Sequence, residues 1–344
     1  MIGRHRGLIA HLKRVSPDLF TIHCTIHRQH LVAKNLSAEL HKSLNFVIKA
    51  VNQIKTHPLT DRLFRQLCHA NEEDFERLLL HTEVRWLSKG ICLQRFYCLF
   101  DSAVQFLNEV GCGSLAIEVE TRKHDIAYLT DFFSKLNEVQ LKLQGCGTTL
   151  VQSKSVIVAF INKLNFFRVC LERGDLQHFP NLLKANLDSK VGDEQVSRYC
   201  GHLENVKMDM ETRFHDLSSL HVPDWFIDPF LTDPLTQESQ FQEHLIDLQH
   251  DVEAKACFGQ VSYPQFWIKF RYRFPALWNK IKLLILAFPT SYLVEKGFSA
   301  VNYLVSKQRN RINVVQRGDL RLFLTKKQPD VVKLVNEHQA QGSH

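Results

Sequence analysis

The stretch Asp125–Leu143, DIAYLTDFFSKLNEVQLKL, decides the fold class of this sequence together with Ser155–Glu172, SVIVAFINKLNFFRVCLE. Apolar residues recur in both at steps of three and four, which is the spacing of one face of an α-helix. These positions are Ile126, Leu129, Phe133, Leu136 and Leu143, with Gln140 as a polar interruption, and then Ile157, Phe160, Ile161, Leu164, Phe167 and Leu171. Gly145 and Gly147 lie between the two stretches and favour a helix end. The pattern predicts two antiparallel helices joined by a short turn.

Helical spacing continues on the N-terminal side of this pair. It predicts helices over Leu31–Lys55, over Thr60–His81 with a break near Asn71, and over Ser88–Val110. Only one segment favours a strand. Residues 19–24 follow Ser16-Pro17 and concentrate β-branched and aromatic side chains, so we expect a strand there. The sequence therefore indicates a mostly α protein with one or few strands.

The C-terminal half is rich in aromatic residues. His221–Pro234 has three prolines beside Trp225, Phe226 and Phe230, which predicts an irregular segment held to the body by its aromatic rings. The aromatic block Phe258–Trp278 must be either core or interface. The apolar runs Lys280–Leu286 and Leu320–Leu324 are too brief to form a core of their own. They must dock within one chain or between chains.

Composition limits the classes of function. The chain has 344 residues, of which 44% are hydrophobic and 23% charged, as in globular proteins. Its 43 basic and 36 acidic residues leave a net charge of +7, which favours a polyanionic partner only mildly. Nine cysteines without a C-x-x-C pair indicate a reducing compartment. No uninterrupted apolar run reaches the roughly 18 residues of a membrane-spanning helix. We expect a soluble intracellular protein with no membrane association.

Three short motifs carry the functional argument. They are His23–Leu31 (HCTIHRQHL), His81–Gly90 (HTEVRWLSKG) and Pro289–Ser299 (PTSYLVEKGFS), the last followed by Arg309-Asn310-Arg311. Taken together, in this order and over nearly the whole chain, they resemble the C-terminal two thirds of hAT-superfamily transposases. The resemblance is closest to their domesticated vertebrate descendants, the BED-type zinc-finger and transposase-like proteins.

The resemblance implies a domain organisation. Residues 1–30 would be a remnant of an RNase H-like core, and 31–279 a helical insertion domain. Residues 280–335 would be the helical C-terminal dimerisation region, and 336–344 a tail. The two catalytic Asp residues of the family are expected to lie outside this chain, as is the BED zinc finger.

The resemblance also assigns residues. Cys24 and His27 match a C-x-x-H of the family, and Glu295 matches its catalytic Glu. Arg85 and Trp86 match an Arg-Trp pair that holds DNA, with the indole stacking on an unpaired base. Two-metal phosphoryl transfer needs several oxygen ligands around two cations about 3.5 to 4 Å apart, which one Glu cannot supply. We therefore expect no enzymatic activity, no catalytic residue, no cofactor and no bound metal.

Each of these residues also has a structural interpretation. Glu295 could be a surface or capping carboxylate, and Trp86 could fill the core while Arg85 pairs with Glu83. Cys24 could bind zinc with neighbouring histidines, but a closed zinc site needs four ligands, and no second pair stands at a matching spacing. Packing and hydrogen bonding at the junction of the expected strand and the following helix are the favoured roles for Cys24 and His27.

The expected function is therefore association. We expect a homodimer, or a hetero-association with transposase-like paralogues, in the nucleus and otherwise in the cytoplasm. Arg85, Trp86, Arg309 and Arg311 are the candidate contacts for nonspecific, salt-sensitive DNA binding. Two alternatives stay open: an active metal-dependent DNA strand transferase or nuclease, and a truncated gene product without a selected function.

Overall fold

The computed structural model describes residues 8–16, 21–79, 86–145, 147–305, 313, 316, 318–325, 328 and 330–333. The chain divides into two compact units, Met1–Pro289 and Thr290–His344. In the described residues every regular element is a helix and none is a strand, so the predicted mostly α fold is confirmed. None of these helices combines the length and the apolar character that crossing a lipid bilayer requires.

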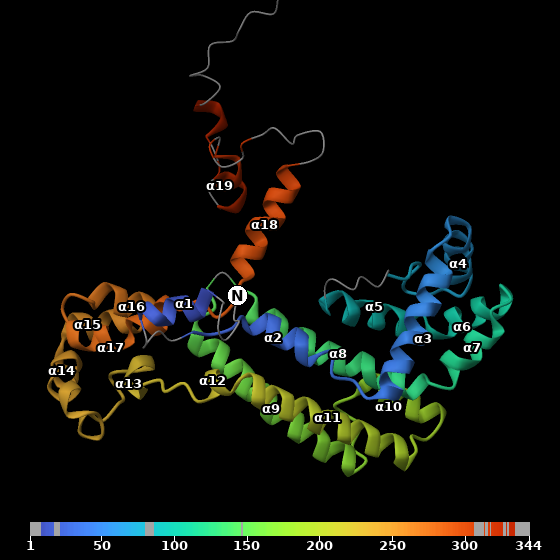
Figure 1. The fold of residues 1–344 in the computed structure, drawn as a ribbon, viewed down its shortest axis with the longest axis horizontal. Coiled ribbons are helices and arrows are strands. Elements are labelled where there is room, and N and C mark those ends of the chain that lie inside the picture. Colours follow the sequence, from blue (N-terminus) through green and yellow to red (C-terminus); the bar gives the residue numbers. More distant parts are fainter. Residues whose placement is uncertain are drawn as a thin grey trace, which may run out of the picture. The chain divides into compact units, whose positions relative to one another are not determined.

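The first unit is a succession of helices, shown in chain order by colour in Figure 1. They are α1 (Leu8–Val15), α2 (Thr25–Val32), α3 (Ala38–Lys55), α4 (Pro58–Ala70), α5 (Trp86–Cys98), α6 (Phe100–Glu109), α7 (Gly113–Glu120), α8 (Lys123–Leu143), α9 (Leu150–Glu172), α10 (Pro180–Asp188), α11 (Asp193–Arg213), α12 (His215–Ser218), α13 (Asp224–Ile227), the 3-10 helix η1 (Pro234–Thr236), α14 (Ser239–His250), α15 (Val252–Phe258), α16 (Tyr263–Phe270) and α17 (Pro275–Leu286).

The two central helices form where the sequence predicts them. α8 ends at Leu143, and α9 begins five residues before its predicted start because Thr149 caps it. The Thr149 hydroxyl accepts a hydrogen bond from the Gln152 amide at 3.2 Å, and the Gln152 side chain accepts one from the Thr149 amide at 3.0 Å. This reciprocal capping box satisfies amides that have no partner inside the helix. α11 packs along α9, and α8 contacts α2, α3, α5, α9 and α10.

Three predicted elements differ from the structure. The single helix expected over Leu31–Lys55 is two, because α2 ends at Val32 and Ser37 caps a new helix by accepting from the Leu40 amide. The helix expected over Ser88–Val110 is interrupted at Leu99. The helix expected over Thr60–His81 ends at Ala70, so the break near Asn71 is confirmed, but no helix resumes in the described residues 71–79.

The predicted strand is wrong in its described part. Residues 21–24 have no regular secondary structure, and Cys24 precedes the first residue of α2. A strand needs a neighbour to pair with its amides and carbonyls. The described residues provide no such strand. The backbone amide and hydroxyl of Thr25 instead donate to the Pro289 carbonyl, at 3.1 and 3.2 Å.

The aromatic block is core and not interface. Phe266, Trp267, Phe270 and Phe274 are buried, and α13 contributes Trp225 and Phe226 to the same cluster. The Trp267 indole donates to the Phe226 carbonyl at 2.8 Å, which pins the proline-rich segment as predicted. Ile281 lies in the same cluster, with Leu284 and Ile285 packed against it. The run Lys280–Leu286 therefore docks within one chain.

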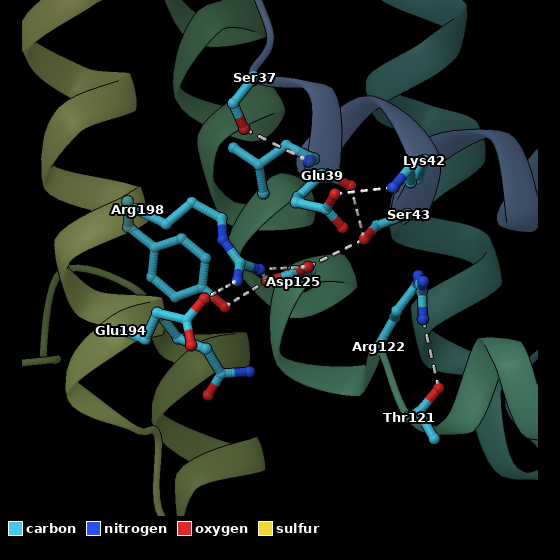
Figure 2. Close-up of polar contacts among 12 residues, drawn as sticks. Ser37, Glu39, Lys42, Ser43, Thr121, Arg122, Asp125, Glu194 and Arg198 are labelled. Carbon is cyan, nitrogen blue, oxygen red and sulfur yellow. Dashed lines mark hydrogen bonds and ion pairs between the residues drawn. The ribbon is translucent and has the colours of Figure 1, made fainter.

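A buried carboxylate connects α3, α8 and α11 (Figure 2). Asp125, 4% exposed in the first turn of α8, accepts from the Ser43 hydroxyl at 2.9 Å and from the Tyr199 hydroxyl at 2.8 Å. Arg198 pairs with it at 3.2 Å and reaches the exposed Glu194 at the same distance. Burying a carboxylate is costly unless it is paired and hydrogen-bonded, so the fold needs these three donors beside Asp125.

One turn further along α8, an aromatic stack surrounds a buried imidazole. The Tyr128 and Tyr199 rings stack with centroids 4.1 Å apart, and the Tyr128 hydroxyl lies 2.7 Å from His202 Nδ1. The Phe132 ring meets the same imidazole edge to face at 4.6 Å. Desolvation by burial lowers the pKa of His202 from 6.5 to about 4.

Replacing Asp125 by Ala should destabilise the fold by about 3 kcal/mol, because it leaves the buried Tyr199 hydroxyl and part of the Arg198 guanidinium without their acceptor. Urea unfolding followed by circular dichroism measures this. Glu194→Ala is the matched control, since it removes the exposed partner of the same arginine and should cost under about 0.5 kcal/mol. Equal stability of the two variants would contradict the role of Asp125.

The lowered pKa of His202 predicts a pH dependence. The unfolded chain protonates this imidazole near pH 6.5 and the folded chain only near 4. The contribution of neutral His202 to the free energy of unfolding is complete above pH 6.5. About 3 kcal/mol of it is lost as the pH falls towards 4. The difference in the free energy of unfolding between the native protein and His202→Gln, measured by urea unfolding at each pH, should narrow over that range. His57→Gln, at an exposed position, should show the same dependence of stability on pH as the native protein. Parallel curves for His202→Gln and the native protein would refute the assignment.

Candidate functional site

The second unit contains two described helices with little core of their own. They are α18 (Tyr292–Leu304) and α19 (Asp319–Leu324), and Gly318 before α19 adopts a φ of +81°, which favours glycine. The Tyr303 and Phe323 rings lie 5.4 Å apart. Among the described residues of this unit only Ala300 is buried.

Large apolar side chains on both helices are exposed. Phe298 is 68% exposed and Tyr303 75%, and Phe323 is 52% exposed although it meets Tyr303. The others are Leu293, Val294, Leu322 and Leu324. Val294 and Phe298 stand four residues apart, so they share one face of α18. A group of large exposed apolar side chains is typical of association sites.

Glu295 lies in the first turn of α18 and is exposed. Its carboxylate accepts a hydrogen bond from the Ser291 hydroxyl at 2.7 Å. A negative charge at this position is favoured by the helix dipole. Among the described residues, no cluster of three ligand-type side chains includes Glu295. The geometry is that of a surface carboxylate that pairs with a neighbouring hydroxyl.

The C-x-x-H residues lie at the start of α2. Cys24 is half-buried before the first helical residue, and His27 is exposed, with its ring 5.0 Å from that of His23. The third histidine of the motif, His30, has its Nε2 3.2 Å from the Gln140 amide nitrogen on α8. In the described part of the chain, these side chains do not form a cluster of three mutually close ligand atoms.

The neighbours of His27 make the buried contacts of α2. The Arg28 guanidinium donates to the Arg213 carbonyl at 2.6 Å, pairs with Asp216 and lies over the Phe214 ring. The Gln29 amide donates to the Leu136 carbonyl at 2.7 Å. The sequence pattern does not distinguish Arg28 or Gln29, because nothing local in a sequence marks a polar residue as buried. They anchor α2 to α8 and to the end of α11.

The candidate DNA contacts are only partly placed. Arg85, Arg309 and Arg311 fall outside the described residues. Trp86 begins α5, and its side chain is also outside the description. Their predicted role therefore stays a prediction.

One cleft of the first unit is open and lined by acidic residues. It has a volume of about 820 Å³ and lies between α9 and the segment before α14, where Asp224, Asp228 and Asp233 line it. Lys154 on its wall donates to the Leu220 carbonyl at 2.5 Å. Three carboxylates repel phosphates, so this cleft does not suit a nucleic-acid backbone.

A comparison with known families bears on the helices around α8. Residues 23–172 match the family model of the FAM200/GTF2IRD2 helical domain. This family is related to domesticated hAT-like transposases. The match runs from the start of the C-x-x-H motif to the last residue of α9, so it includes α2 to α9 and the Arg85-Trp86 position. It does not include Glu295 or the two helices of the second unit.

Proposed function

We propose that the chain is a catalytically inactive, transposase-derived protein that acts in the nucleus by self-association through α18 and α19. The observation that carries the proposal is the exposed apolar surface of these helices, above all Phe298 and Tyr303. Fully burying one such side chain contributes about 1.5 to 3 kcal/mol. Two short helices that bury only one described residue between them need a further surface to cover these rings.

The partner of these helices is a second copy of the chain, or a transposase-like paralogue with an equivalent segment. A two-fold contact uses the same patch on both subunits, so one apolar surface is sufficient for a closed dimer. The motif resemblance supports this choice, because in hAT transposases the corresponding C-terminal region contributes to subunit contacts. The exposed position of Glu295 in the first turn of α18, with a side-chain hydroxyl as its partner, supports the absence of catalysis.

DNA contact is the second part of the proposal. The net charge of +7 and the basic residues that follow α18 support binding to phosphates, and Arg309 and Arg311 are the residues assigned to it. Such contacts need only lysine and arginine on one surface, so they carry no sequence preference.

Replacing Phe298 by Ser should shift the association equilibrium towards monomers by at least about tenfold, because one buried ring per subunit is lost. Sedimentation velocity at micromolar concentration measures the shift, and circular dichroism checks that the helices remain. Leu187→Ser is the control, since this leucine is 80% exposed on α10 of the first unit. A monomeric native chain, or a Phe298→Ser variant that unfolds, would contradict the proposal, the latter indicating docking within one chain.

DNA affinity should fall steeply with salt, with a slope in log–log form of about 0.9 per neutralised phosphate. Replacing Arg309 and Arg311 together by Ala should reduce that slope by about two. Fluorescence anisotropy with unrelated duplexes measures both. The double variant of the exposed Arg62 and Arg77 removes the same charge and should leave the slope unchanged. Sequence-selective binding, or an unchanged slope in the first variant, would refute the assignment.

A further inference from the structure

Three side chains of ligand type gather where α9 ends. Cys170, Asp175 and His178 each offer one ligand atom, and these atoms all lie within 4.8 Å of one another. Cys170 is buried on the last turn of the helix, Asp175 is exposed and His178 is half-buried. They come from nine consecutive residues of the sequence, far from Glu295 in the chain. The Cys24 motif, by contrast, does not bring three such atoms together in the described residues.

The backbone at the end of α9 places the carboxylate beside the thiol. Gly174 adopts a φ of +74°, the Asp175 amide donates to the Cys170 carbonyl at 2.9 Å, and the Gly174 amide donates to the Leu171 carbonyl at 3.0 Å. This pair of bonds is a Schellman motif, which ends a helix and turns the chain back over its last turn. The Asp175 backbone is thereby bound to that of Cys170, and its carboxylate lies near the Cys170 thiol.

The other two ligands are oriented by their neighbours. One carboxylate oxygen of Asp175 accepts a hydrogen bond from the Gln177 amide at 3.0 Å, which leaves further lone pairs available. The His178 ring packs edge to face on Phe166 at 4.9 Å and against Phe167 at 5.7 Å. Both phenylalanines belong to α9, so the imidazole is held against the same helix as Cys170.

A thiolate, an imidazole and a carboxylate together are the donor set that zinc accepts, and the thiolate disfavours the hard cations magnesium and calcium. Zinc bonds of about 2.0 to 2.3 Å set tetrahedral ligand atoms roughly 3.3 to 3.8 Å apart. Separations of at most 4.8 Å enter that range when the ligand atoms move by about 1 Å. We propose that Cys170, Asp175 and His178 form a zinc site whose fourth position is open to solvent.

Metal binding here would stabilise the connection between α9 and α10. The segment after His178 places Phe179 in the core, where its ring stacks on Tyr128 at 5.6 Å, and α10 begins at the next residue. A zinc ion would therefore tie the end of α9 to the start of α10. The open position, beside an exposed carboxylate, would admit water or a ligand atom from another molecule.

The test uses the full chain without a histidine tag, titrated with Co²⁺ as a spectroscopic probe and then with Zn²⁺ in competition. We expect saturation at one Co²⁺ per chain, with the near-ultraviolet charge-transfer band of a thiolate ligand and visible bands of tetrahedral intensity. Zn²⁺ should displace the probe. Cys170→Ser should abolish the thiolate band, and His178→Gln and Asp175→Asn should each weaken affinity by at least about tenfold.

Cys200→Ser is the matched control. Cys200 is 8% exposed, as is Cys170, and its thiol donates to the Arg168 carbonyl at 3.7 Å. This variant should keep the band and the stoichiometry, and circular dichroism of each metal-free variant should match that of the native chain. Absence of a saturable thiolate band would overturn the proposal. A band that survives Cys170→Ser and is lost in Cys24→Ser would also overturn it, placing the metal at the C-x-x-H motif.

Discussion

The carboxylate of Asp125 is the contact on which the arrangement of the helices around α8 depends. It is buried, and its acceptor capacity is used by Ser43 of α3 and by Tyr199 and Arg198 of α11. A buried carboxylate without partners would destabilise the fold by several kcal/mol. A shift of α3 or α11 along α8 would separate Asp125 from its partners, so this contact fixes the positions of both helices. Tyr199 also stacks on Tyr128 of α8, so the residue that binds Asp125 packs in the apolar core as well.

A second buried carboxylate on the same helix performs the equivalent task for α10. Asp131 accepts from the Asn181 and Leu182 amides at 3.2 and 3.0 Å and from the Asn181 side chain at 2.6 Å. These amides belong to the first turn of α10 and have no partner within that helix. Burial raises the pKa of Asp131, while its hydrogen bonds oppose the rise. α8 is thus a helix whose polar residues position its neighbours.

The segment matched by the FAM200/GTF2IRD2 helical domain depends on residues outside it to cover its buried side chains. The match ends with α9, yet the partners of Asp125 include two residues of α11, and α11 packs along α9. The Arg28 side chain of α2 likewise contacts Arg213, the last residue of α11, and Asp216 beyond it. The first unit therefore folds as a longer piece than the matched region. The second unit differs in kind, because its two helices keep their aromatic residues exposed and are suited to meeting another surface.

The sequence alone determined the mostly α class, the pairing of α8 with α9 and the break at Asn71, because apolar periodicity and capping residues act over a few neighbouring positions. It also indicated that Trp225 and Phe226 hold the proline-rich segment. Tertiary structure decided that residues 21–24 are not a strand, since a strand exists only with a partner. It decided that the aromatic block is core and that Asp125, Arg28 and His202 are buried. Cys170, Asp175 and His178 meet only because a glycine with positive φ turns the chain back over α9. These outcomes depend on contacts between distant residues or on backbone geometry, which residue type and spacing do not specify.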